Sequence, residues 1–195
     1  MNYYEALEYF NIGKIKKCTD YFRNNGYMLE YAYSLLLSGR QDESAEIFGT
    51  ILSVRADWAL KLIKIIQGSS KYLPSFFQIR NFLEIDVNLL LRSGQAEYVS
   101  KLADNAELFQ NINQESYKFF GRVLLKNNQF DISEFFLEKA LNVCYNDPEL
   151  HFLRMELYYV TGDIVNTHKS LNACLAVSPD YYPAQKIMQD MCGGE

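Results

Sequence analysis

Three basic side chains stand at equal spacing in one predicted helix of the chain. Lys118, Arg122 and Lys126 follow one another at every fourth residue, which places them on one face of a helix. Like charges at this spacing destabilise a helix by roughly 0.2–0.5 kcal/mol per pair. A carboxylate would neutralise them, and the planar guanidinium of Arg122 can hold a carboxylate through two hydrogen bonds. The stripe therefore indicates either a binding site for an acidic segment or a helix face that water solvates.

Catalytic and metal-binding patterns are missing from the sequence. The glycine-rich nucleotide loops, the G-x-S-x-G turn of hydrolases and the H-E-x-x-H zinc motif do not occur. The two histidines, His151 and His168, lie on different predicted helices. The cysteines lie on separate predicted helices without a C-x-x-C pair: Cys18, Cys144, Cys174 and Cys192. We expect no enzyme, no cofactor and no metal, with reduced cysteines packed as small apolar residues.

The charge distribution excludes one class of partner. The formal net charge is −5, and residues 128–195 carry 4 basic against 10 acidic side chains. The remaining residues are nearly balanced, so no basic excess exists that could neutralise the phosphates of a nucleic acid. No stretch approaches the roughly 18 apolar residues of a membrane span, and the first residues lack the basic region of a signal peptide. We expect a cytoplasmic protein that neither binds nucleic acid nor inserts into a membrane.

An internal repeat must position the charged stripe. Gly94, Asn128 and Gly162 are each 34 residues apart, and an apolar helical run precedes each of them. The same apolar pattern returns around each turn, with Leu90, Leu124 and Tyr158 before it and Ala106, Ala140 and Cys174 after it. Each copy indicates two antiparallel helices joined at a residue that tolerates the left-handed conformation. Gly121 falls on the face that meets the second helix, so we expect close packing at that position.

The periodicity predicts an all-α chain of about ten or eleven helices. The less regular first part indicates helices over about residues 2–12, 14–25, 27–38, 41–53 and 56–67. Residues 75–92 indicate one long helix, and two helices with a kink near Asn81 are the alternative. Asp180 can cap a final helix that runs to about Met191.

These elements predict a single helical-repeat domain over residues 1–195. It comprises irregular hairpins and an extra helix over 1–73, regular 34-residue repeats over 74–179, and a capping helix with a tail over 180–195.

The unit over residues 116–145 resembles the tetratricopeptide repeat, a helix–turn–helix of 34 residues. The positions that carry the resemblance are Tyr117, Phe120, Gly121, Leu124, Phe130, Ser133, Leu137 and Ala140. The two hairpins at the start of the chain keep only part of the pattern, at Ala6, Gly13, Cys18 and Phe22, and at Ala32, Gly39, Ser44 and Phe48. The resemblance implies a right-handed superhelical solenoid of antiparallel helix hairpins, whose first helices line a concave groove. Stacked hairpins create such a surface by their small rotation per repeat.

The free face of the first helices supplies the expected partner-binding residues. They are Asn88, Arg92, Lys118, Arg122, Lys126, Phe152, Glu156 and Tyr159. The resemblance implies an adaptor or scaffold that binds a protein or peptide in this groove, and an acidic segment or a C-terminal carboxylate would suit the basic stripe. One alternative is a small chaperone that resembles the helical-repeat chaperones of bacterial secretion systems. Another is a structural or regulatory subunit that associates with itself as a homo-oligomer.

Overall fold

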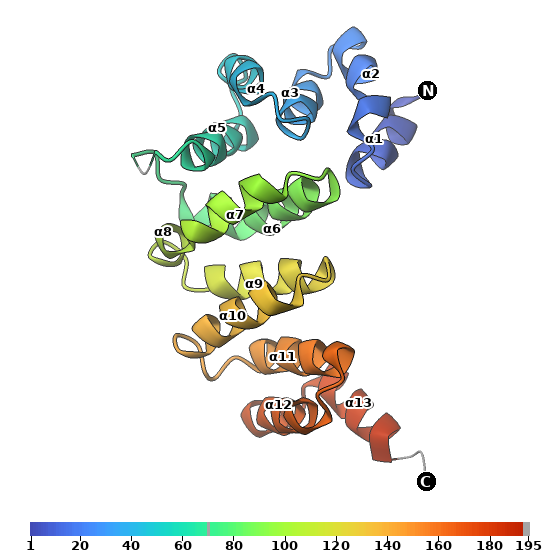
Figure 1. Cartoon of the computed structure of the whole chain (residues 1–195), viewed down its shortest axis with the longest axis vertical. Helices are drawn as coiled ribbons and strands as arrows, with labels where there is room; N and C mark the ends of the chain where they lie inside the picture. Colours follow the sequence, from blue (N-terminus) through green and yellow to red (C-terminus); the bar gives the residue numbers. More distant parts are fainter. Residues whose placement is uncertain (70, 193–195) are drawn as a thin grey trace. The chain divides into compact units, whose positions relative to one another are not determined.

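The computed structural model describes residues 1–69 and 71–192, with side chains up to residue 190, and this part is all-helical (Figure 1). The described residues form thirteen α-helices and one short 3-10 helix, without any strand. The chain divides into two compact units, Met1–Asn113 and Gln114–Glu195. The all-α prediction is confirmed. The boundary between the units lies within the stretch that the sequence assigns to regular repeats.

In the first unit, each helix packs against its neighbours in the chain. The helices are α1 (Tyr3–Asn11), the 3-10 helix η1 (Ile15–Lys17), α2 (Thr19–Asn24), α3 (Met28–Leu36), α4 (Gln41–Phe48), α5 (Val54–Ile66), α6 (Phe76–Arg92), α7 (Ala96–Asp104) and α8 (Ala106–Gln110). Helix α6 is continuous, as the first of the two alternatives predicts. Ser75 caps it, because its hydroxyl accepts from the Gln78 amide and the Gln78 side chain accepts from the Ser75 amide.

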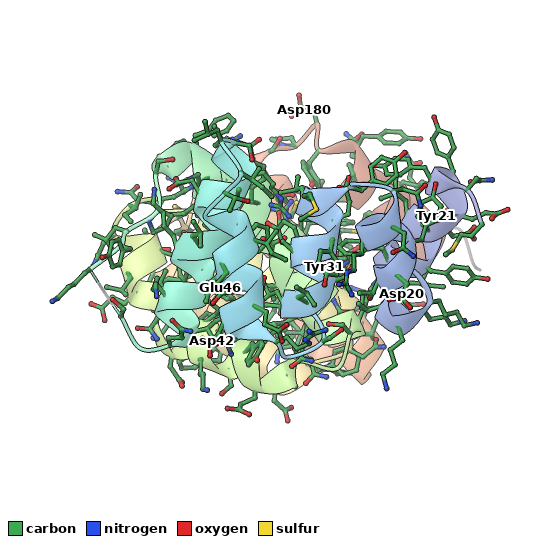
Figure 2. The ribbon with its side chains drawn as sticks, turned by 90° about the horizontal axis from the view of Figure 1, so that it is seen from above. Asp20, Tyr21, Tyr31, Asp42, Glu46 and Asp180 are labelled. Carbon is green, nitrogen blue, oxygen red and sulfur yellow. The ribbon has the colours of Figure 1, made fainter. Side chains whose placement is uncertain are left out.

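Helix α4 illustrates how the sequence assigns the faces of these helices. Ser44 and Phe48, four residues apart, are buried. Asp42 and Glu46, also four residues apart, lie on the exposed surface of this unit (Figure 2). Residues four apart share one helix face, so α4 has one buried face and one exposed face. A helix this short is stabilised mainly by the packing of its buried face rather than by its own helix propensity.

The second unit contains two helical hairpins and a final helix. Its elements are α9 (Ser116–Lys126), α10 (Phe130–Leu141), α11 (Pro148–Thr161), α12 (Ile164–Val177) and α13 (Tyr182–Cys192). Helix α9 packs against α10, α11 against α12, and α13 against α12. Ala184 of α13 joins a buried cluster with Met155, Leu171 and Cys174. The final helix therefore covers an apolar surface of the last hairpin, as the sequence predicts.

Five hairpins of the chain share one register. Their turn residues all have positive φ, namely Gly13 (78°), Gly39 (85°), Gly94 (84°), Asn128 (59°) and Gly162 (80°). The residue seven positions before each turn and the residue five positions after it are buried in every hairpin, in the pairs Ala6 and Cys18, Ala32 and Ser44, Val87 and Val99, Gly121 and Ser133, and Met155 and Thr167. The predicted left-handed turn positions are confirmed.

Two of these pairs are joined by the same hydrogen bond. The Ser44 hydroxyl donates to the Ala32 carbonyl at 2.8 Å, and the Ser133 hydroxyl donates to the Gly121 carbonyl at 2.8 Å. A Cβ atom added at Gly121 would lie 2.5 Å from Leu137 Cδ2 and 2.7 Å from Leu137 Cγ. Leu137 is completely buried, and protein interiors are close-packed, so such a contact is tight. The close helix–helix contact predicted at Gly121 is confirmed.

The described part of the structure has thirteen α-helices rather than the predicted ten or eleven, and two of the predicted helices are broken. Residues 14–25 form η1 and α2, since a 3-10 turn brings Ile15 and Cys18, three residues apart, into the core together. The second helix of the third repeat divides at Asn105 into α7 and α8. The Asn105 side chain donates to the Lys101 carbonyl at 2.8 Å, a local bond that competes with the helix ladder. Helix α4 also ends early, at Phe48 rather than residue 53, where Gly49 follows.

Candidate functional site

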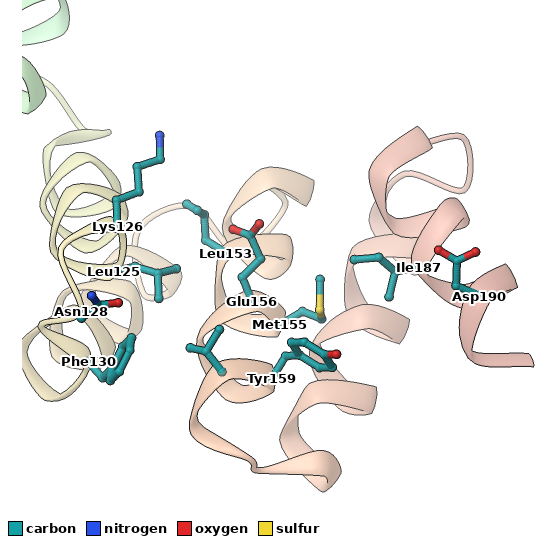
Figure 3. Close-up of a pocket in the computed structure, with 11 residues that line it drawn as sticks. Leu125, Lys126, Asn128, Phe130, Leu153, Met155, Glu156, Tyr159, Ile187 and Asp190 are labelled. Carbon is teal, nitrogen blue, oxygen red and sulfur yellow. The ribbon is translucent and has the colours of Figure 1, made fainter. Parts of the chain in front are cut away.

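The second unit contains a pocket of about 690 Å³ between α9, α11 and α13 (Figure 3). Its lining consists of Leu125, Lys126, Asn128, Phe130, Leu153, Met155, Glu156, Tyr159, Val160, Ile187 and Asp190. The volume lies within the range of about 300–1,000 Å³ that is typical of ligand pockets. The lining is mainly apolar, with a few polar groups at its edge, which is the usual composition of a binding site.

Local sequence features place these side chains around one opening. Helix α9 ends at Lys126, and the left-handed Asn128 turns the chain toward α10. On α11, Leu153, Glu156 and Val160 follow one another at intervals of three and four residues, so they share one helix face. On α13, Ile187 and Asp190 share a face in the same way.

The apolar part of the pocket has a buried floor and an exposed edge. Leu125, Leu153 and Met155 are buried and form the floor. Tyr159 and Val160 line the same pocket but are 63% and 55% exposed. Exposed apolar side chains next to a buried apolar floor form a surface that favours binding, because a partner that covers it removes apolar area from water.

Three charged side chains line this opening without a fixed partner. Within the described part of the chain, the side chains of Lys126, Glu156 and Asp190 make neither a hydrogen bond nor an ion pair. Figure 3 shows them on three different helices, Lys126 on α9, Glu156 on α11 and Asp190 on α13. Partial burial raises the pKa of Glu156, while the positive charge of Lys126 acts to lower it. The pocket thus offers charges of both signs to a ligand.

Lys118 does not line this opening, and its side chain is not on the open helix face that the sequence suggests. Its side chain is only about 6% exposed, and its Nζ atom lies 2.9 Å from Glu115, 2.6 Å from Asp147 and 3.1 Å from Glu149. Burial alone would lower the pKa of Lys118, but the hydrogen bonds to Asp147 and Glu115 outweigh it and raise the pKa. The neighbouring hairpin therefore already supplies the carboxylates that the basic stripe was expected to receive from a partner.

Arg122 joins the same group of charges. Its Nη1 atom lies 3.0 Å from Glu149, and its guanidinium lies 5.7 Å from the centre of the Phe119 ring. We call Glu115, Lys118, Arg122, Asp147 and Glu149 the ionic cluster. It joins the start of α11 to α9, and Asp147 also caps α11 by accepting from the amides of Glu149 and Leu150. The predicted stripe is therefore divided, with two members in the ionic cluster and one at the pocket.

The other predicted site residues belong to different elements of the structure. Glu156 and Tyr159 join Lys126 in the pocket. Phe152 does not, because its half-buried ring packs against Tyr181, with ring centroids 5.6 Å apart, beneath the segment that leads into α13. Asn88 and Arg92 lie on α6 in the first unit, where Arg92 donates to the Asn11 carbonyl at 3.2 Å.

Sequence reasoning missed the residues that complete the pocket. Ile187 and Asp190 come from α13, which the sequence identifies only as a capping helix. Leu125 and Leu153 lie in apolar helical runs, and such runs predict a buried core rather than a pocket. The only sequence signal that could have indicated Asp190 is its place three residues after Ile187 on an otherwise amphipathic helix.

A buried charge in the first unit serves the fold. Asp86 accepts from the Tyr33 hydroxyl at 3.1 Å and from the Trp58 indole, and it pairs with Arg55. Burial raises the pKa of Asp86, while the charge of Arg55 acts to lower it. The Arg55 guanidinium lies over the rings of Tyr33 and Phe82, at 4.7 and 4.5 Å. Both carboxylate oxygens are occupied, so this group holds α3, α5 and α6 together.

A basic hollow in the first unit also belongs to the fold. Lys14, Lys16 and Lys17 line a cavity of about 430 Å³ together with residues that follow the ends of α1, α3 and α6. The carboxyl end of a helix carries a partial negative charge, which favours cations beside it. The three lysines complement these helix ends.

The described cysteine and histidine side chains lie in separate surroundings. Burial raises the pKa of Cys18 and that of Cys174 to about 11, which keeps both thiols protonated and unreactive. Cys144 is also free, and the side chain of Cys192 lies outside the described residues. His151 is buried against the Tyr145 carbonyl, whereas His168 is exposed. In the part of the chain that the structure describes, no three His, Cys, Asp or Glu side chains converge to hold a metal ion.

Among the described residues, no helix combines the length and the apolar character that crossing a bilayer requires. Comparison of the chain with models of protein families, with curated proteins and with solved structures finds no match.

Proposed function

We propose that this chain is a protein-interaction module, an adaptor or scaffold, and that the pocket between α9, α11 and α13 binds a segment of a partner protein. The observation that carries the proposal is the coincidence of an apolar floor with three charged side chains at its edge that make no hydrogen bond or ion pair with the described residues. All three side chains are exposed, so they are solvated by water and remain available to a ligand. A few polar groups at the edge of a mainly apolar pocket are typical of ligand-binding sites.

The repeated hairpin register supports a kinship with the tetratricopeptide repeat. Five hairpins place a left-handed turn, a buried residue before it and a buried residue after it at constant offsets. We propose on this ground that the chain is a helical-repeat protein with the solenoid arrangement that the resemblance implies. Its free cysteines agree with a reducing compartment such as the cytoplasm.

A subunit that associates with itself is the second candidate. Ile132 and Phe135 are exposed on α10, three residues apart, and neither lines the pocket. A small exposed apolar surface of this kind fits an interface between two copies of the chain. A secretion-type chaperone is a special case of the leading proposal, because it too would hold a segment of its client.

The test is a selection from a displayed library of random peptides on the immobilised full chain. Tyr159→Ser removes an exposed ring from the pocket, and Tyr145→Ser removes an equally exposed ring elsewhere in the same unit, since both are 63% exposed. The proposal predicts that selected peptides bind the unmodified chain and the Tyr145 variant but lose affinity for the Tyr159 variant. Failure to enrich any peptide, or equal losses in both variants, would contradict it.

A further inference from the structure

The charges that line the pocket are biased toward one sign. Among its lining residues there is one cation, Lys126, and there are two anions, Glu156 and Asp190. Lys118 and Arg122, which the sequence places on the same face as Lys126, are held by Asp147 and Glu149. Of the basic stripe, only Lys126 therefore lines the pocket, which two carboxylates also line.

Glu156 has the surroundings of a carboxylate that favours an incoming cation. It is partly desolvated and makes no hydrogen bond or ion pair within the described part of the chain. Tyr159, three residues further on the same helix, exposes its ring at the same pocket. A Lys or Arg side chain placed here would meet a carboxylate and the face of an aromatic ring, both of which attract a cation.

The net negative charge of residues 128–195 also favours a basic segment. Residues 128–195 contain 4 basic and 10 acidic side chains, so the field around the pocket attracts positive segments and repels negative ones. A carboxylate-bearing segment would gain the interaction with Lys126 but would approach Glu156 and Asp190 at the same opening. The contacts in the structure thus disfavour the carboxylate ligand that the basic stripe first indicates.

We infer that the pocket accepts a partner segment in which apolar side chains are flanked by a Lys or Arg residue. This inference rests on the proposed function. The apolar side chains cover the floor made by Leu125, Leu153 and Met155. The basic side chain pairs with Glu156, Asp190 adds negative charge at the same pocket, and the Lys126 end of the pocket tolerates a neutral or acidic residue.

The experiment compares peptides selected by the unmodified chain with their binding to charge variants. Glu156→Lys reverses a pocket charge. Glu138→Lys makes the same change in net charge at an exposed position of α10 that does not line the pocket. We expect the selected peptides to be enriched in Lys or Arg next to apolar residues. Glu156→Lys should lower their affinity by roughly 10-fold, and Glu138→Lys by less than about 2-fold, because a single exposed charge pair contributes little at a distance.

Each alternative outcome identifies what has failed. Selected peptides that bind through the pocket but show no basic residue, or prefer acidic ones, overturn this inference and leave the proposed function intact. Equal losses in the Glu156 and Glu138 variants attribute the preference to net charge and also overturn it. A chain that sediments as a dimer, and that Glu156→Lys converts to a monomer, makes a second copy the occupant and overturns it as well. The measurement is repeated with Glu156→Gln, which introduces no positive charge. This variant must also bind the basic peptides with lower affinity than the unmodified chain.

Discussion

The two ends of helices α9 and α11 use charged side chains in opposite ways. Near the start of both helices, Lys118 and Arg122 meet Asp147 and Glu149 at hydrogen-bonding distance, and Lys118 is almost fully buried. Toward their far ends, Lys126 and Glu156 line a pocket and form no ion pair with any described residue. The residue types are the same, so charge alone does not distinguish a structural from a recognition role. The distinction depends on whether the neighbouring helix supplies a partner.

The largest expected effect comes from a substitution that disrupts the packing of α9, the helix that carries the charged side chains at both ends. Gly121→Leu would force a side chain into the contact between α9 and Leu137, where even a Cβ atom lies 2.5 Å from Cδ2. Overpacking of this kind costs about 3 kcal/mol or more when the neighbour cannot move. Thermal unfolding followed by circular dichroism should show a large fall in the midpoint. Glu138→Leu, at the adjacent exposed position on α10, should leave it nearly unchanged.

The next effect separates the ionic cluster from the pocket. Lys118→Met leaves three carboxylates without their common cation, and we expect a loss of about 2–3 kcal/mol in the free energy of unfolding, less than for a fully buried pair because the carboxylates are partly exposed. Lys126→Met removes an exposed cation and should change stability by less than about 0.5 kcal/mol. Urea unfolding of both variants measures the contrast. Equal losses would mean that the ionic cluster does not hold the two helices together.

The contribution of Lys118 should also depend on pH in a defined direction. Its pKa is raised in the folded chain above the ordinary value of 10.5, so the folded state binds the proton more tightly than the unfolded state. The stabilisation is therefore complete below pH 10.5 and declines as the pH rises above it. We expect the difference in melting temperature between the unmodified chain and Lys118→Met to be constant from pH 7 to about 10 and then to narrow. A difference that widens above pH 10.5 would contradict this sign.

The smallest effect concerns the pocket and has the opposite sign. The pKa of Glu156 is raised by burial, so its charged form opposes folding once the pH exceeds the ordinary value of 4.5. Glu156→Gln should therefore increase stability near pH 7, by at most about 0.5 kcal/mol because the side chain is largely exposed. The increase should vanish below pH 4.5, where the carboxyl is protonated in both states. A destabilised Glu156→Gln variant would mean that Glu156 stabilises the fold, as the members of the ionic cluster do.

The local features of this fold could be predicted from the sequence, and the partners of charged residues could not. Gly94, Asn128 and Gly162 identify their turns because a residue that tolerates the left-handed conformation, placed after an apolar run, is typical of a helix end. Gly121 identifies a close contact for the same kind of local reason. Two of the three carboxylate partners of Lys118, in contrast, lie 29 residues away at Asp147 and 31 residues away at Glu149. The i, i+4 spacing of the stripe says nothing about what faces it from the next hairpin.

The pocket was only partly predictable for a related reason. Glu156 and Tyr159 follow from the periodicity of α11, whereas Asp190 depends on how α13 packs against the last hairpin. Phe152 shows the same limit, since its spacing is that of a groove residue while α13 and the preceding segment cover it. Helical spacing defines which residues share a face, and packing decides which of those faces remains open.

One paired measurement tests the central claim that the two ends of α9 and α11 have different roles. Melting temperature and affinity for a selected peptide are measured on the same preparations of Lys118→Met and Glu156→Lys. The affinity is measured at a temperature where both variants are folded. We predict that Lys118→Met lowers the melting temperature and keeps the affinity, while Glu156→Lys keeps the melting temperature and lowers the affinity. A folded Lys118→Met that loses the peptide, or a Glu156→Lys that binds it as tightly as the unmodified chain, would contradict the claim.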